Sequence, residues 1–197
     1  MMIEDTFNHP GRKDEVRKDY VPGKVKLEDA LSKIEAILKG TKTKKIRDRR
    51  GEITVEGSVK DLVLLELKRL GYDHFVALSC IDQLEDNKFD LVYHLCSYGV
   101  GALVMVKTNV DRDAPSIGSV VEIFRPAITY EREIHEMFGV SFPGNPRLTQ
   151  FILEDWEGPP PMRKDFDSIS YSQETYGMKV RYEKGLPPGL GKKEVDR

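Results

Sequence analysis

The chain has 197 residues and a net charge of −2, with 39% hydrophobic and 32% charged residues. This length suits one domain with tails, and the chain lacks the basic excess of many nucleic-acid-binding proteins. Its two cysteines, Cys80 and Cys96, form no CxxC pair. That spacing argues against a disulfide scaffold, a structural zinc site or an iron–sulfur cluster, and favours a reduced, cytosolic protein. The many Lys and Glu residues are typical of thermophiles.

The N-terminal part predicts an arm followed by a helix. Residues 1–24 are polar and end in a Pro-Gly turn signal, which indicates a flexible N-terminal arm without the apolar core of a secretory signal. Apolar residues at helical spacing predict a helix over 27–38. The basic run KTKKIRDRR at 42–50 either contacts phosphates or, as we expect, forms a solvated loop.

The middle of the chain predicts a sheet. Residues 53–55 alternate as in a strand, and residues 58–70 have the caps and apolar spacing of a helix. Three strand-like runs follow, at 74–81, 89–98 and 102–110. Because their links are short, neighbouring strands should pair antiparallel. Helices before and after such strands predict an α+β fold, a two-layer domain with a small, mainly antiparallel sheet and flanking helices.

Helical signals return before the composition changes. We expect a helix over 115–124 and another over 126–138, which Gly139 ends in a left-handed conformation. The following residues are rich in Pro and Gly. We therefore predict a domain over 25–166 and an extended, partner-binding tail over 167–197. No run of ~18 apolar residues occurs, so we expect that the chain does not cross a membrane unaided.

Titratable residues gather on the predicted helix over 126–138. His135-Glu136 begins an HExxH motif, but its second histidine is missing. Glu131 with His135, and Arg132 with Glu136, stand one turn apart, which predicts an ion-paired helix face. The alternative is a metal site with distant ligands, as in a free-standing metal-dependent enzyme. Glu133 lies about 200° around the helix from Glu131, so we expect that one supports the fold and the other faces outward.

Other chemical signatures are incomplete. His94 and Cys96 project to one face of a strand, but no orienting partner is evident. Trp156, which precedes three prolines, is either an anchor for a partner or a lid on the core. Arg163-Lys164-Asp165 either pairs with charges across a subunit boundary or lies in a solvated loop. This part of the chain favours docking over catalysis.

A family resemblance rests on four stretches in order. Residues 130–139, YEREIHEMFG, resemble the signature of the 30 kDa subunit of respiratory complex I and of related subunits of energy-converting membrane-bound [NiFe] hydrogenases. FDLVYHL at 89–95, EDWEG at 154–158 and RKDF at 163–166 agree with the same family. The resemblance covers about residues 50–166 and is specific.

The resemblance implies a non-catalytic assembly subunit of a membrane-bound, ion-translocating oxidoreductase. The chain would bind no cofactor or metal, and [NiFe] or iron–sulfur clusters would lie in partner subunits. Those partners would be a hydrogenase-like large subunit, an iron–sulfur small subunit and membrane antiporter-like subunits, with no nucleic acid. The chain would be peripheral, on the cytoplasmic side of the cell membrane. We expect its folding and docking surface to include Glu131, Arg132, Glu133, Trp156, Arg163, Lys164 and Asp165.

Departures from the family pattern suggest to which branch of the family the chain is related. Asn145 replaces the histidine of a Gly-His-Pro turn, and the prolines at 159–161 lengthen a second such turn. These changes favour a hydrogenase-like or sulfur-reducing relative over the 30 kDa subunit of NADH-quinone oxidoreductase proper. A metal-dependent enzyme and nucleic-acid binding through residues 42–50 are the rival hypotheses.

Overall fold

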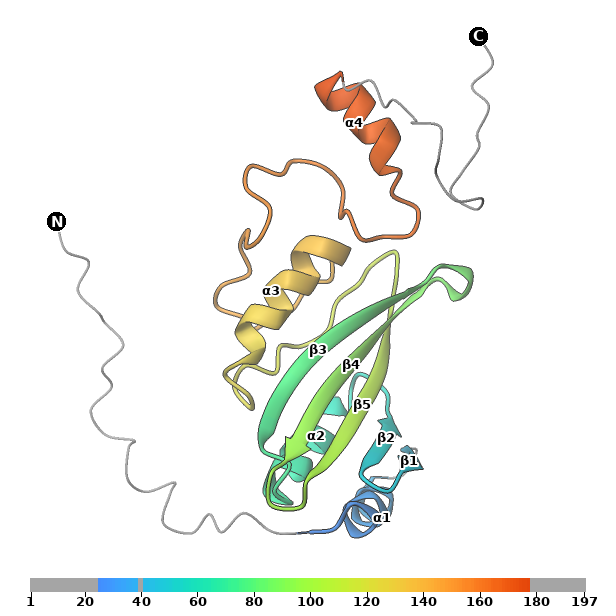
Figure 1. The fold of residues 1–197 in the computed structure, drawn as a ribbon, viewed down its shortest axis with the longest axis vertical. Helices are drawn as coiled ribbons and strands as arrows, with labels where there is room; N and C mark the ends of the chain where they lie inside the picture. The colour runs from blue at the N-terminus through green and yellow to red at the C-terminus, as the bar shows by residue number, and fades with distance from the viewer. Residues whose placement is uncertain (1–24, 39–40, 178–197) are drawn as a thin grey trace, which may run out of the picture.

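The structure is a computed structural model that describes residues 25–38 and 41–177 (Figure 1). The predicted arm over 1–24 and residues 178–197 of the predicted tail lie outside these residues. In chain order the elements are α1 (Leu27–Ile37), β1 (Lys42–Arg47), β2 (Arg50–Thr54), α2 (Lys60–Arg69), β3 (His74–Gln83), the short 3-10 turn η1 (Leu84–Asp86), β4 (Lys88–Ser97), β5 (Ala102–Asp111), α3 (Ala127–Phe138) and α4 (Ser168–Tyr176).

The strands form one sheet in the order β1-β2-β5-β4-β3. Three neighbouring pairs are antiparallel, and β2 with β5 is parallel. Asn87 and Gly101 take left-handed conformations, with φ of 51° and 65°, in the turns on either side of β4. The predicted α+β fold with a mainly antiparallel sheet is confirmed. The parallel pair was not predicted, because α2, β3 and β4 separate its strands in sequence.

Helices α1, α2 and α3 cover one face of the sheet. The ring of Phe138 in α3 lies 5.9 Å from that of Phe89 in β4. The Lys60 ammonium of α2 lies 5.9 Å from the ring centre of Tyr93, which faces the same side of β4. Gly51 of β2 leaves room for two leucine side chains of α1. In Figure 1, α3 runs alongside β3 and α1 lies below β1 and β2.

The helix predicted over 115–124 is wrong, because these residues form turns and irregular chain. The Ile117 amide donates to the Ser141 carbonyl at 3.0 Å, and the Val120 amide donates to the Glu131 carboxylate at 2.8 Å. Because these amides find partners outside the segment, no helical hydrogen bonds are needed to satisfy them.

Two further segments differ from expectation. Residues 42–47 form an exposed edge strand, β1, where a loop was expected. Residues 168–176 form α4, where an extended tail was expected. The Asp167 carboxylate accepts hydrogen bonds from the amides of Ile169 at 3.0 Å and Ser170 at 3.1 Å. These are N-cap bonds, which stabilise the start of a helix.

We predict that Gly139→Ala destabilises the protein by about 1.5 kcal/mol or more. Gly139 ends α3 with φ of 78°, and a β-carbon there would lie 3.0 Å from Pro160 and 3.1 Å from Arg163. Urea unfolding measures the change. Gly118→Ala is the control, because its β-carbon meets nothing within 4 Å; it should leave the stability unchanged or raise it. Equal stabilities for the two variants would contradict this account of the turn.

Candidate functional site

The first residue of the candidate site is Glu131 of α3, which is fully buried, with 0% exposure. Its carboxylate accepts hydrogen bonds from the Ser119 hydroxyl at 2.7 Å, the Val120 amide at 2.8 Å and the Asn145 side-chain amide at 2.8 Å. Burial raises the pKa of Glu131, and these three bonds oppose that rise. The side chain therefore joins the loop before α3 to the turn after it, and it supports the fold from within.

Glu133, two residues further along α3, is exposed. This confirms that one of the two acids supports the fold while the other faces outward. The contribution of Glu133 to a docking surface stays a prediction.

Arg132 and Glu136 hold the loop that follows α3. The Arg132 guanidinium donates to the Gln150 carbonyl at 2.6 Å and lies 4.6 Å from the ring centre of Phe151. The Glu136 carboxylate accepts from the amides of Phe151 and Ile152, both at 2.8 Å. Burial opposes ionisation of Glu136, but these amide bonds lower its pKa. The two side chains of the predicted ion pair therefore hydrogen-bond to the loop.

His135 lies on the same helix, and its Nδ1 is 2.9 Å from the Val140 carbonyl. Across residues 25–38 and 41–177, no three His, Cys, Asp or Glu side chains are placed together to hold a metal ion.

His94 lies 3.4 Å from the Ser79 hydroxyl on the face of the sheet opposite Tyr93. Burial lowers the pKa of His94.

A buried guanidinium anchors the RKDF stretch. Arg112, 6% exposed, donates from Nε to Asp82 at 2.9 Å and from Nη2 to Asp165 at 2.5 Å. The Lys164 amide also donates to Asp82, at 2.8 Å. Burial opposes ionisation of Asp82, yet the Arg112 and Lys164 bonds hold its pKa below the ordinary value. Asp165 therefore pairs with a charge inside this chain.

Arg163 and Lys164 differ in their exposure. Arg163 donates from Nε to the Phe138 carbonyl at the end of α3, at 2.8 Å, and its guanidinium lies 5.2 Å from the ring centre of Phe89. The Lys164 residue is exposed. Within the predicted triplet, Arg163 and Asp165 therefore bond to groups of this chain, and Lys164 is exposed.

Trp156 belongs to a small aromatic cluster apart from the main core. Its ring lies 6.0 Å from that of Phe166 and 5.0 Å from that of Tyr171 in α4. Its indole N–H donates to the Pro159 carbonyl at 3.1 Å. A β-carbon on Gly158 would lie 2.6 Å from Tyr171, so only glycine fits there. This cluster connects the loop to α4.

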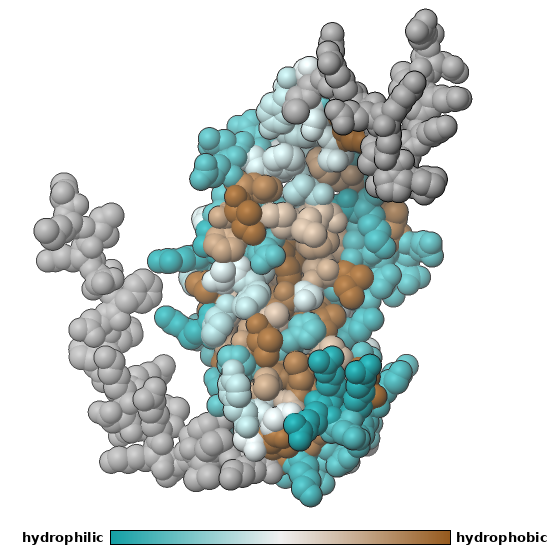
Figure 2. Space-filling model, viewed as in Figure 1, coloured by the Kyte–Doolittle hydropathy of each residue, from teal (hydrophilic) through white to brown (hydrophobic). Residues whose placement is uncertain are grey.

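Apolar side chains are exposed along the loop between α3 and α4 and on the first turn of α4. Figure 2 shows brown patches at the level of this loop. We define the loop surface as the exposed side chains, 41% to 56% accessible, of Phe151, Ile152, Met162 and Ile169. An exposed apolar surface is typical of interaction sites.

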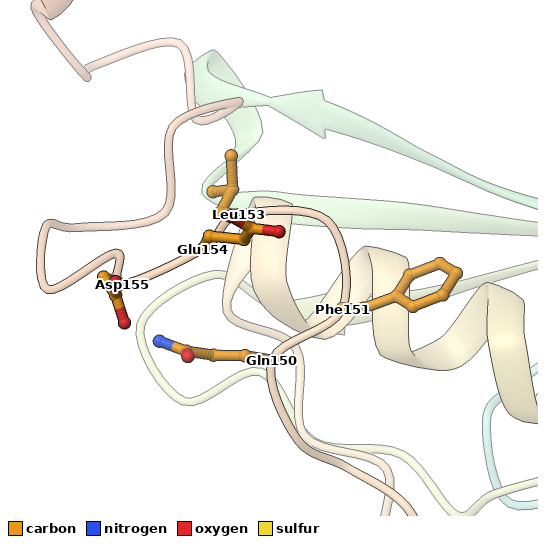
Figure 3. Close-up of a pocket in the computed structure, with 5 residues that line it drawn as sticks. All are labelled: Gln150, Phe151, Leu153, Glu154 and Asp155. Atoms are coloured by element: carbon orange, nitrogen blue, oxygen red, sulfur yellow. The ribbon is translucent and has the colours of Figure 1, made fainter.

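A shallow pocket of about 280 Å³ lies beside the loop surface and is lined by Gln150, Phe151, Leu153, Glu154 and Asp155. In Figure 3, Phe151 points away from Gln150 and Asp155. The titratable side chains of this lining are two carboxylates, those of Glu154 and Asp155. Among the described residues, no helix has the length and hydropathy to span a bilayer.

Comparison with known proteins identifies the family. Residues 53–172 match the family described as respiratory-chain NADH dehydrogenase, 30 Kd subunit. The chain belongs to this family. It is 36% identical over 101 residues to the C subunit of the F(420)H(2) dehydrogenase of Methanosarcina mazei, a match that covers 51% of this chain and 64% of that protein. It is also 36% identical over 105 residues to the C subunit of the NADH-quinone oxidoreductase of Moorella thermoacetica, covering 53% and 71%.

Two solved structures resemble this chain. A chain of the membrane-bound sulfane sulfur reductase, an archaeal respiratory membrane complex, matches with a TM-score of 0.73 and 31% identity. The match covers 80% of this chain and 95% of that one. A trypsin-resistant fragment of Nqo5 matches with a TM-score of 0.56 and 23% identity, over 63% of this chain and 100% of the fragment, and supports the fold alone.

Sequence reasoning missed the partners of the site residues. Arg112, Asp82 and Ser119 lie outside the four recognised stretches. Arg112 directly follows β5, and Asp82 lies within the last two residues of β3. Their pairing follows from the register of a sheet that the sequence did not specify. Asn145 was noted only as a departure from the family pattern, although it donates to Glu131.

We predict that Glu131→Ala lowers the free energy of unfolding by about 3 kcal/mol, because it leaves buried donors unpaired. Glu133→Ala, on the exposed side of the same helix, should change it by less than about 0.5 kcal/mol. Urea unfolding of both variants at neutral pH tests this contrast. A small loss for Glu131→Ala would mean that its three hydrogen bonds are not needed by the fold.

We also predict that Asp82→Asn costs about 3 kcal/mol, because it leaves the buried Arg112 poorly paired. Asp165→Asn should cost less than about 1 kcal/mol, since the Asp165 carboxyl is 53% exposed. The pKa of Asp82 is lowered from 3.8 on folding, so its stabilisation is present above pH 3.8 and is lost as the pH falls through the folded pKa. Stability of wild type and Asp82→Asn should therefore converge in acid; a constant difference would refute this linkage.

Proposed function

We propose that this chain is a non-catalytic assembly subunit of a membrane-bound, ion-translocating oxidoreductase related to complex I. The observation that carries the proposal is that the charged side chains in the stretches resembling the family form hydrogen bonds mainly within this chain. Arg132, Glu136, Arg163 and Asp165 fasten the loop between α3 and α4 to the domain. A loop held in this way keeps the apolar side chains of the loop surface outward, where a neighbouring subunit would bury them.

For the partner we propose a hydrogenase-like large subunit, with an iron–sulfur small subunit beside it. Redox centres would then lie in those subunits, and the chain would sit at the cytoplasmic side of the membrane through them. The support is family membership, together with the likeness to a chain of an archaeal respiratory membrane complex. Two exposed charged residues, Glu133 on α3 and Lys164 in the RKDF stretch, would pair with charges on the partner.

For the branch of the family we propose a sulfur-reducing or hydrogenase-like complex. The structural likeness to the sulfane sulfur reductase chain extends over 95% of that chain at 31% identity and supports this branch. The sequence match to the Moorella thermoacetica protein covers 71% of its length. The second candidate is the 30 kDa subunit of NADH-quinone oxidoreductase proper, which the 36% identity to that same protein favours.

Affinity purification from detergent-solubilised membranes tests the proposal. The tagged chain should bring down a large subunit with hydrogenase-like cysteine motifs and an iron–sulfur subunit, in fixed ratio, as identified by mass spectrometry. Recovery of the chain alone would overturn the assembly role. A metal bound in stoichiometric amount by the isolated chain would instead favour the metal-dependent enzyme.

A double variant tests the loop surface within this proposal. Ile152→Asp with Met162→Asp should abolish co-purification and leave the thermal unfolding temperature unchanged, because both side chains are more than half exposed. Leu62→Asp on α2 is the matched control, with 56% exposure, and should co-purify normally. Retention of the partner by the double variant would exclude this surface as the docking site.

A further inference from the structure

The edge of the sheet formed by β1 and the start of β2 is strongly basic. We call residues 42–50, KTKKIRDRR, the basic edge; it holds six Lys or Arg residues and one Asp, a net charge of +5 in a chain of net charge −2. Figure 2 shows strongly hydrophilic residues at the lower right, where Figure 1 places β1 and β2. The basic edge precedes the family match at 53–172, so family membership does not explain it.

Most of these positive charges lack a counter-charge. Lys45 lies 2.6 Å from Glu28 in α1 and 3.5 Å from Asp48. Within the described part of the chain, no carboxylate lies within ion-pair distance of the remaining five, Lys42, Lys44, Arg47, Arg49 and Arg50. All five are exposed. Several like charges held together create a positive potential that attracts an anionic partner.

The strand β1 also has an unpaired side. It pairs with β2 and stands first in the sheet order, and no other strand among the described residues lies along it. An edge strand presents free N–H and C=O groups, to which an extended segment can add as a further strand. Lysines on such an edge discourage pairing between two copies of the same chain, because like charges would meet. The same lysines do not discourage pairing with an acidic segment, because opposite charges would meet.

We propose that the basic edge docks an acidic, extended segment of another subunit, which adds as a strand beside β1. Lys42 and Lys44 lie two residues apart and so face one side of the sheet, where alternate carboxylates of an added strand reach them. The free strand edge is what favours a peptide over a nucleic acid or a membrane, since neither of those uses the main-chain hydrogen bonds. This inference rests on the proposed function in taking the partner from the same assembly.

Zero-length carbodiimide cross-linking of the purified complex, followed by mass spectrometry, tests this docking. The Glu28–Lys45 pair is an internal positive control, because its atoms lie 2.6 Å apart. We expect Lys42 or Lys44 to be cross-linked to Asp or Glu of a second polypeptide. Amide hydrogen exchange over residues 42–47 should also be slower in the complex than in the isolated chain, by about tenfold or more. Cross-links without this protection would contradict strand addition.

Charge-reversal variants distinguish an effect of the basic edge from an effect of the net charge of the chain. Lys42→Glu with Lys44→Glu should remove the cross-link and lower recovery of that partner about tenfold. Lys33→Glu with Lys88→Glu makes the same charge change at exposed sites on α1 and β4 and should alter neither.

Two results would overturn the inference. In the first, an intact complex shows the Glu28–Lys45 cross-link but none from Lys42 or Lys44. Docking at the basic edge would then be refuted, while the proposed assembly role would stand. In the second, the isolated chain binds duplex DNA, RNA or phosphatidylglycerol vesicles through Lys42 and Lys44. The partner would then be a nucleic acid or a membrane surface.

Discussion

The buried carboxylate of Glu131 is the contact on which the architecture of the second half of the chain depends. It accepts hydrogen bonds from Ser119 and Val120 before α3 and from Asn145 after it. Burying a carboxylate is unfavourable unless donors replace its water, and here a hydroxyl, a main-chain amide and a side-chain amide do so. Because both flanking loops bond to one side chain, α3 is fixed against the sheet. Arg132 and Glu136 are thereby aimed at the loop that carries the exposed apolar residues.

A second buried contact extends this rigidity to the end of the domain. Arg112 at the end of β5 holds Asp82 at the end of β3 and Asp165 in the RKDF stretch. Arg163 adds a bond to the last carbonyl of α3, at Phe138. The acidic and basic residues in the stretches that resemble the family thus largely form hydrogen bonds and ion pairs within the chain. Their combined effect is to present a loop of irregular chain in one conformation, which lowers the entropy lost when a partner binds it.

The sequence specified local features well and long-range pairings poorly. Apolar periodicity located α1, α3 and the three long strands, and the left-handed conformation of Gly139 followed from its place after Phe138. The helix expected over 115–124 failed because Glu131, eleven residues beyond Val120, takes the amide that a helix would have used. The strand β1 was missed because charged side chains on an edge strand resemble those of a loop. The roles of Arg112 and Asp82 depend on sheet register, which local patterns do not encode.

We propose that the loop between α3 and α4 binds another subunit of a membrane complex, and that redox chemistry takes place in other subunits. Electron cryomicroscopy of the complex purified through this chain tests that claim most directly. The account predicts that Phe151, Ile152 and Met162 lie buried against a neighbouring subunit and that the redox cofactors lie in other polypeptides. A map with these side chains in solvent, or with a redox centre held by this chain, would contradict it.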